Sequence, residues 1–208
     1  MGRYAGPKCR LCRREGVKLF LKGTRCETAK CGVSRRDQAP GINTWRRPKF
    51  SEYGRQLREK QKVKRFYGLM DNQFKLAFRR AEKAKGNTGA NLLVLLERRL
   101  DNIVFRGGFA LSRAQGRQLI NHGHITVNGK KVDVASYSLK TGDVVRPRDG
   151  DKARKLVQEN LEIAKSRETP SWLTVNASPP EIAIVQLPTR EEVSIPIEEQ
   201  LVVEILSR

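Results

Sequence analysis

The chain has 208 residues, with 42 Lys and Arg against 22 Asp and Glu, so its formal net charge is +20. This length suits two modest domains better than one large one. The longest apolar run, residues 92–96, is too short to cross a membrane, and no apolar stretch of the signal-peptide kind follows the first residues. We therefore expect a cytoplasmic protein whose thiols are free or bound to metal.

The charge is unevenly distributed along the chain. Residues 1–100 carry a net +19, residues 101–150 a net +4 and residues 151–208 a net −3. The basic part predicts a densely anionic partner, which favours a nucleic acid, with an anionic membrane surface as the rival. The acidic part predicts a different surface, suited to a basic protein neighbour.

All four cysteines lie near the N-terminus, in the pattern Cys-x2-Cys-x13-Cys-x4-Cys. Two pairs of thiols can surround zinc tetrahedrally, so we predict a structural zinc site, with an iron–sulfur cluster and unligated thiols as the alternatives. Basic residues nearby are expected to offset the charge of four thiolates and to lower the thiol pKa values. The predicted ligands are Cys9, Cys12, Cys26 and Cys31, and the basic neighbours include Lys8, Arg10, Arg13 and Arg14.

A loop rich in Pro, Gly and Arg, residues 35–49, precedes a predicted helix over residues 51–67. One side of this helix carries a basic stripe, made of Arg55, Arg58, Lys62 and Arg65. Such a stripe is usually a solvated face. Here it lacks nearby acids in the sequence and follows a basic loop, so we predict that it contacts phosphates.

Two further helices are predicted over residues 71–86 and 88–106, and the wide apolar face of the second makes it a core helix. A capping box at Ser112 and Gln115 begins a short helix that ends near residue 121. Its exposed face is predicted to contact RNA through Arg113, Arg117 and Asn121.

The pattern then changes to strands. Residues 125–132 predict a β-hairpin with a type I′ turn at Asn128-Gly129, which places Lys130 and Lys131 at its tip as further RNA contacts. Strands are also predicted at residues 137–139, 144–145, 182–187 and 193–197, and a helix at 151–165. Residues 201–206 fit either a strand or a helix.

No arrangement of residues typical of catalysis is apparent. His122 and His124 have no Cys or acidic cluster beside them, so we interpret them as turn or RNA-contact residues. The chain has no Walker-type phosphate loop and no nucleophile elbow. We therefore expect neither an enzyme nor a small-molecule substrate. An RNA-modifying enzyme or synthetase, or a free RNA chaperone or messenger-RNA repressor, are the rival classes.

Several segments match the motifs of a known protein family. Residues 99–106, 108–110, 112–113, 115, 117–120 and 122–132, continued by residues 136–137 and 142–143, resemble the RNA-binding module of the family of ribosomal small-subunit protein four. Residues 9–16, 46–48, 57–62 and 67–68 resemble its N-terminal region, and residues 198–202 and 207–208 its end. The cysteines match the bacterial-type, zinc-carrying branch of the family.

The resemblance implies an α+β fold. A zinc knuckle and basic loop would occupy residues 1–50, and a helical domain residues 51–94, completed by about residues 190–208. The RNA-binding module and its β-rich extension, with a small, largely antiparallel sheet, would occupy residues 95–189. Two departures concern packing: Gly107 stands where Leu is usual and leaves less apolar cover, and Gly116 stands where Ala is usual, which costs about 1 kcal/mol in a helix.

The resemblance also implies a function. The protein would be a primary binder of small-subunit ribosomal RNA, which nucleates assembly of the subunit body and contributes to translational accuracy. Its partners would be ribosomal protein five, other small-subunit proteins and the messenger RNA near the channel by which it enters the subunit. Matching basic residues in the N-terminal region add seven further predicted RNA contacts, which are Arg3, Lys8, Arg10, Arg13, Arg14, Arg46 and Arg47.

Overall fold

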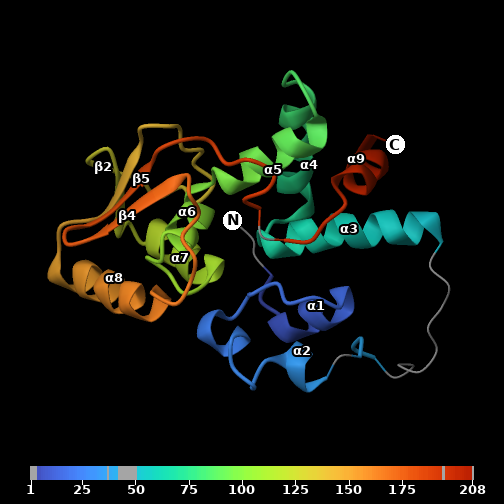
Figure 1. The fold of residues 1–208 in the computed structure, drawn as a ribbon, viewed down its shortest axis with the longest axis horizontal. Helices are drawn as coiled ribbons and strands as arrows, with labels where there is room; N and C mark the ends of the chain where they lie inside the picture. The colour runs from blue at the N-terminus through green and yellow to red at the C-terminus, as the bar shows by residue number, and fades with distance from the viewer. Residues whose placement is uncertain (1–3, 37, 42–50, 194, 208) are drawn as a thin grey trace. The chain divides into compact units, whose positions relative to one another are not determined.

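The computed structural model describes residues 4–36, 38–41, 51–193 and 195–207. The chain forms two compact units (Figure 1). The helical unit comprises Met1–Leu92 and Ser194–Arg208, and the sheet unit comprises Leu93–Val193. The chain therefore leaves the helical unit, builds the sheet unit and returns. No helix of the described residues has the length and apolarity needed to cross a bilayer.

The helical unit contains mainly helices, as predicted. They are α1 (Lys8–Glu15), the 3-10 helix η1 (Gly23–Cys26), α2 (Gly32–Arg35), α3 (Glu52–Phe66), α4 (Asp71–Glu82) and α9 (Glu199–Ser207), and α5 (Thr88–Glu97) begins here. Ser51 caps α3, because its hydroxyl accepts a hydrogen bond from the Gly54 amide at 3.2 Å. The C-terminal segment is a helix because its apolar side, including Val202, packs against α3.

The prediction of one continuous helix over residues 88–106 is wrong in one respect. The segment is helical, but it is divided into two helices, α5 and α6 (Leu100–Arg106). Arg99 between them is extended and forms a β-bridge with Ser138. The Leu100 amide donates to the Tyr137 carbonyl at 2.9 Å, and the Leu139 amide donates to the Arg98 carbonyl at 3.0 Å. These non-local hydrogen bonds replace helical ones and so interrupt the helix. The strand predicted over residues 137–139 is accordingly reduced to a single β-bridge.

The sheet is antiparallel at every pairing found, in the order β2-β1-β3-β5-β4. Its strands are β1 (Ile125–Val127), β2 (Lys130–Lys131), β3 (Val144–Pro147), β4 (Leu173–Ala177) and β5 (Pro180–Ile184). Asn128 and Gly129 have φ values of 49° and 78°, which confirms the type I′ turn. The prediction of a strand over residues 193–197 is wrong for the described part of that stretch.

The core of the sheet unit joins the strands to α6, α7 (Arg113–Asn121) and α8 (Asp151–Ala164). Fully buried side chains come from all of these layers, among them Ile103, Ile120, Ile125, Val157, Trp172 and Ile182. Both glycine departures have a packing reason. A Cβ on Gly107 would collide with the side chain of Ile182, so the expectation of poor apolar cover there is wrong. A Cβ on Gly116 would lie 3.1 Å from the Asp101 carbonyl oxygen, so Gly permits close packing of α7 on α6.

Candidate nucleic-acid interface and thiol cluster

The four cysteines come from three neighbouring segments of the helical unit. Cys9 and Cys12 lie on α1, Cys26 ends η1 and Cys31 directly precedes α2. All four line one small cavity, together with Leu21, Lys22, Gly32 and Val33. A Cβ on Gly32 would lie 2.8 Å from the Cys9 Cβ, so the approach of α1 and α2 requires glycine. Among the described residues, no three Cys, His, Asp or Glu side chains converge closely enough to hold a metal ion.

The expectation that basic neighbours lower the thiol pKa values is wrong for two of the cysteines. Burial raises the pKa of Cys12 and that of Cys26, although backbone hydrogen bonds at Leu19 and Lys22 act against it. Burial also acts to raise the pKa of Cys31, but hydrogen bonds from Ser34 and the backbone of Val33 outweigh it and lower that pKa. Backbone N–H groups therefore do more than Lys or Arg to favour a thiolate here.

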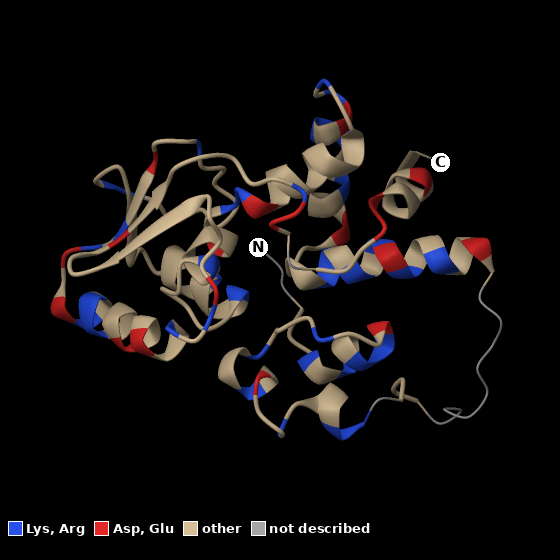
Figure 2. Cartoon of the chain, viewed as in Figure 1, with Lys and Arg blue, Asp and Glu red and all other residues tan. Residues whose placement is uncertain are grey.

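The basic stripe on α3 is balanced by acids that are distant in the sequence or on the same helix. Arg58 and Arg65 both pair with Glu15 of α1, the first at 3.3 Å. Lys62 pairs with Glu59 at 2.5 Å. The premise that this stripe lacks balancing acids is therefore wrong, and Arg58 and Arg65 join α3 to α1 within the helical unit. Figure 2 shows acidic positions among the basic ones along α3. Arg55 is exposed.

Glu15 is the residue that sequence inspection missed in this unit. Its side chain is 0% exposed, and its Oε2 atom accepts no hydrogen bond from the described residues. Burial raises the pKa of its carboxyl, although Arg65 and Arg58 act to lower it. A signal did exist, because Glu15 is the only acid among the first 26 residues.

The remaining basic residues near the cysteines have mixed surroundings. Arg13 donates to the Gln38 carbonyl at 2.9 Å and Arg14 to the Pro40 carbonyl at 2.7 Å, so both hold the chain after α2 against α1. The Lys8 ammonium lies 4.9 Å from the centre of the Tyr4 ring, and Arg10 is exposed. Three predicted contacts lie outside the described residues: Arg3, Arg46 and Arg47.

In the sheet unit, Arg113 and Arg117 are buried rather than displayed, with exposed fractions of 7% and 8%. Arg113 donates to the Asn102 side-chain oxygen at 2.8 Å, and Arg117 lies 3.7 Å from the carboxylate of Asp101. The prediction that they form a solvent-exposed face with Asn121 is therefore wrong. Arg113 and Arg117 do lie on one side of α7, as predicted, but that side packs against α6.

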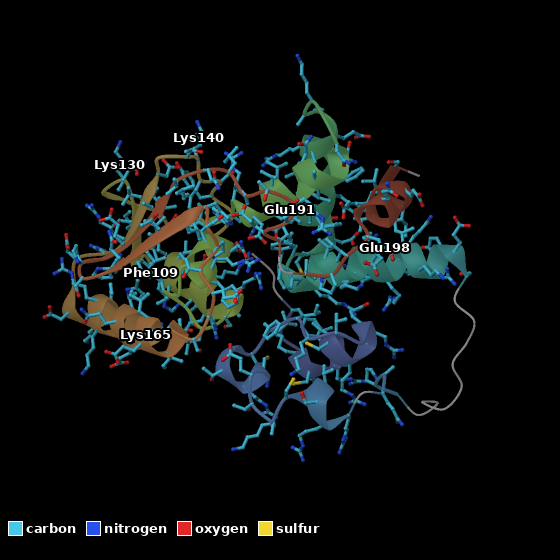
Figure 3. All side chains as sticks on the ribbon, viewed as in Figure 1. Phe109, Lys130, Lys140, Lys165, Glu191 and Glu198 are labelled. Atoms are coloured by element: carbon cyan, nitrogen blue, oxygen red, sulfur yellow. The ribbon has the colours of Figure 1, made fainter. Side chains whose placement is uncertain are left out.

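An exposed basic cluster lies instead where α7 gives way to the hairpin. It comprises the exposed residues Asn121, His122, Lys130 and Lys131, with His124 partly exposed, and we call these five residues the hairpin cluster. The two imidazole rings are 6.1 Å apart between centroids. The stem of Lys131 lies over Gly123, where a side chain would collide with it. Figure 3 shows Lys130 projecting from the sheet unit into solvent.

Comparison with known proteins agrees with this organisation. Residues 3–97 match the family described as Ribosomal protein S4/S9 N-terminal domain, and residues 98–145 match the S4 domain. The chain is 54% identical, over the full length of both chains, to small ribosomal subunit protein uS4 of Thermoanaerobacter sp. (strain X514). It is also 54% identical over the full length to the uS4 proteins of Thermoanaerobacter pseudethanolicus and Thermodesulfovibrio yellowstonii.

The chain belongs to the uS4 family of small ribosomal subunit proteins. The uS4 family is one of structural proteins of the ribosome rather than of enzymes. The S4 domain covers α6, α7 and the hairpin cluster, whereas α8, β4 and β5 of the same unit lie beyond residue 145.

Proposed function

We propose that this protein is a primary binder of small-subunit ribosomal RNA in the cytoplasm, that it nucleates assembly of the subunit body, and that it contributes to translational accuracy. The observation that carries the proposal is the full-length similarity to relatives named as small ribosomal subunit protein uS4. The net charge of +20 supports it, because a strongly basic chain gains binding free energy when phosphates release their counterions.

Reconstitution of the subunit tests this role. Small-subunit RNA is mixed with the other subunit proteins, with and without this chain, and the particles are separated by sedimentation. We expect omission to leave a smaller particle that lacks the proteins that bind later. A free RNA chaperone would instead speed RNA folding without remaining in the particle, and that outcome would contradict the proposal.

We assign the RNA contacts of the sheet unit to the hairpin cluster first. Its cations are exposed, and the described residues place no ion-pair partner beside Lys130 or Lys131. The turn at Asn128-Gly129 fixes the backbone of the hairpin tip, and with it the positions from which the two lysine side chains extend. None of the five residues is a Phe, Tyr or Trp, which favours recognition of folded RNA by its shape over stacking on single strands.

Ribosomal protein five and other small-subunit proteins are the proposed protein neighbours, and messenger RNA is a proposed contact near the channel by which it enters. The acidic surface is smaller than the sequence implies, because Glu192 accepts hydrogen bonds from Ser171 and Thr189. Glu191 and Glu198 are exposed (Figure 3). Charge reversal of both to Lys should weaken incorporation of a neighbouring protein, and unchanged incorporation would contradict this assignment.

Zinc is the proposed structural cofactor, held by Cys9, Cys12, Cys26 and Cys31, and binding it would require the four thiols to draw closer together than they lie in the described residues. The shared cavity and the N–H groups near the sulfur atoms support it, as does the absence of any acid or His that would complete an open, catalytic site among its lining residues. When bound, the ion would cross-link α1, η1 and α2 and supply folding free energy. Elemental analysis should find one zinc per chain. Iron with sulfide, or no metal at all, are the two alternatives, and either result would contradict the proposal.

A further inference from the structure

The strands β1 and β3 bury the side chains of one face and expose those of the other. Ile125, Val127 and Val145 belong to the core of the sheet unit. Successive side chains of a strand point to opposite faces of its sheet, so Arg146 and Arg148 lie on the face away from this core. Both arginines are exposed. The two residues therefore present their guanidinium groups on an open face of the sheet.

Arg148 lies directly beside the hairpin cluster. The pairing of β1 with β3 continues for one residue beyond both strands, because the Arg148 amide donates to the His124 carbonyl at 2.8 Å. Residues opposite each other in an antiparallel pair have Cβ atoms about 4.5–5.5 Å apart. The Lys131 side chain extends toward the same end of β1, since its Nζ atom lies 3.1 Å from the position that a Cβ on Gly123 would take. Basic side chains from three segments thus gather at this end of the sheet.

The two exposed arginines differ in the acids around them. Arg146 donates through Nε and Nη2 to the Oε2 atom of Glu181 on β5, at 3.0 Å and 2.8 Å. The side chain of Arg148 forms no hydrogen bond or ion pair with any residue that the structure describes. The acid that follows it in the chain, Asp149, pairs with Arg154. Arg148 therefore keeps its N–H donors available, whereas the charge of Arg146 is already balanced.

The chemistry of Arg148 and its surroundings suits an RNA phosphate. A guanidinium group offers two parallel N–H donors to two phosphate oxygens. The hydrogen bond to the His124 carbonyl fixes the Arg148 backbone, so the side chain extends from a defined position. An acidic protein segment would also be attracted to this charge. RNA is favoured because Arg148 adjoins the hairpin cluster, so one stretch of RNA backbone can contact both.

We propose that Arg148, with His124 and Lys131, forms a phosphodiester-binding site for ribosomal RNA on the open face of the sheet, an inference that rests on the proposed function. Arg148 lies outside the matched S4 domain, which ends at residue 145. The site extends the RNA-contact surface from the hairpin cluster across β1 to the end of β3. The segment between β3 and α8 thereby takes part in RNA binding.

The experiment compares the full-length parent with Arg148→Gln, which keeps a long stem and a planar end but loses the charge. Arg146→Gln is the matched control, because it makes the same change two residues away on the same face, at a residue paired with Glu181. Both substitutions lower the net charge by one, so a general electrostatic effect is the same in both. Binding to a folded small-subunit RNA fragment is measured by filter retention over a series of salt concentrations, and melting followed by circular dichroism reports the fold.

For Arg148→Gln we expect roughly tenfold weaker binding, as for the removal of one charged hydrogen-bond pair. The slope of log K against log salt should become shallower by about 0.7–0.9, the change expected when one phosphate is no longer neutralised. Arg146→Gln should keep the parental slope. Both variants should melt like the parent, because both side chains are exposed and an exposed ion pair contributes little to stability. Arg148→Lys should keep the slope but bind more weakly without the planar group.

Two outcomes would overturn the inference: a parental slope for Arg148→Gln, or equal changes for Arg148→Gln and Arg146→Gln, which would indicate only a general field. Subunit reconstitution gives a third. If Arg148→Gln binds the RNA like the parent but yields a particle that lacks a neighbouring protein, the site serves an acidic protein segment and the RNA assignment is wrong. If the parent itself fails to bind the RNA, the proposed function fails. If the parent binds and Arg148→Gln is unchanged, only this site fails.

Discussion

Arg113 and Arg117 illustrate how one residue type can serve packing or binding, depending on what lies opposite. Their spacing on α7 is that of one helix face, as the sequence predicts, but the face meets α6 and its acid Asp101. Nothing local in the sequence distinguishes a face that meets solvent from one that meets another helix. The same holds for Arg58 and Arg65, whose partner Glu15 is more than 40 residues away.

We expect the double substitution Arg113→Ala and Arg117→Ala to lower the free energy of unfolding by about 3 kcal/mol, because it leaves buried polar partners unmatched. Urea unfolding measures this, with Gln118→Ala on the exposed side of the same helix as the control. A double variant as stable as the control would show that the contacts of Arg113 and Arg117 with α6 contribute nothing to stability. The earlier interpretation of both residues as RNA contacts would then be preferred.

Glu15 gives a pH-dependent prediction. Burial raises its pKa above the usual 4.5, so the folded chain holds the proton more tightly than the unfolded chain does. The free energy of unfolding therefore falls as pH rises from 4.5 through the raised pKa of the folded state. Relative to Glu15→Gln, which does not titrate, the parent should lose stability across that window. Urea unfolding at several pH values measures the difference, and a difference that is constant with pH would contradict the assignment.

At the scale of elements, the sequence was sufficient to predict the structure where a helix cap or a tight turn determines it. Ser112 accepts a hydrogen bond from the Gln115 amide at 3.2 Å, as a capping box requires, although the Gln115 side chain accepts from Leu111 instead of the cap residue. The hairpin register is as predicted. The break between α5 and α6 could not be predicted, because the hydrogen bonds that replace the helix come from residues 135–139.

The hairpin cluster gives the prediction at this scale. Replacing Lys130 and Lys131 by Ala should leave the melting temperature unchanged, because both side chains are exposed. It should weaken RNA binding and make the salt slope shallower by about 0.7–0.9 for each phosphate that the two lysines neutralise in the parent. Lys140→Ala, exposed elsewhere in the sheet unit, is the control. An unchanged slope would mean that the hairpin lysines are ordinary surface residues.

At the scale of the whole molecule, composition was the most informative property. The concentration of positive charge before residue 150 favours a nucleic-acid partner, and the change from helical to strand periodicity near residue 125 predicts a chain with both helices and strands. The α+β architecture and the ribosomal RNA partner were implied by the family resemblance. Charge counts cannot show which cations are paired inside the fold. Tertiary packing decides that. It buries Arg113 and Arg117, pairs the partly exposed Arg58 and Arg65 with Glu15, and leaves the hairpin cluster exposed.

The most direct test of the central claim is the position of the protein in a sucrose gradient of cell lysate. At moderate salt and millimolar Mg²⁺, we predict that it sediments with small ribosomal subunits and with whole ribosomes. It should leave the subunit fraction only when the RNA is digested or the salt is raised far enough to screen the phosphate contacts. Recovery of most of the protein at the top of the gradient, free of ribosomal RNA under the moderate-salt conditions, would contradict the account.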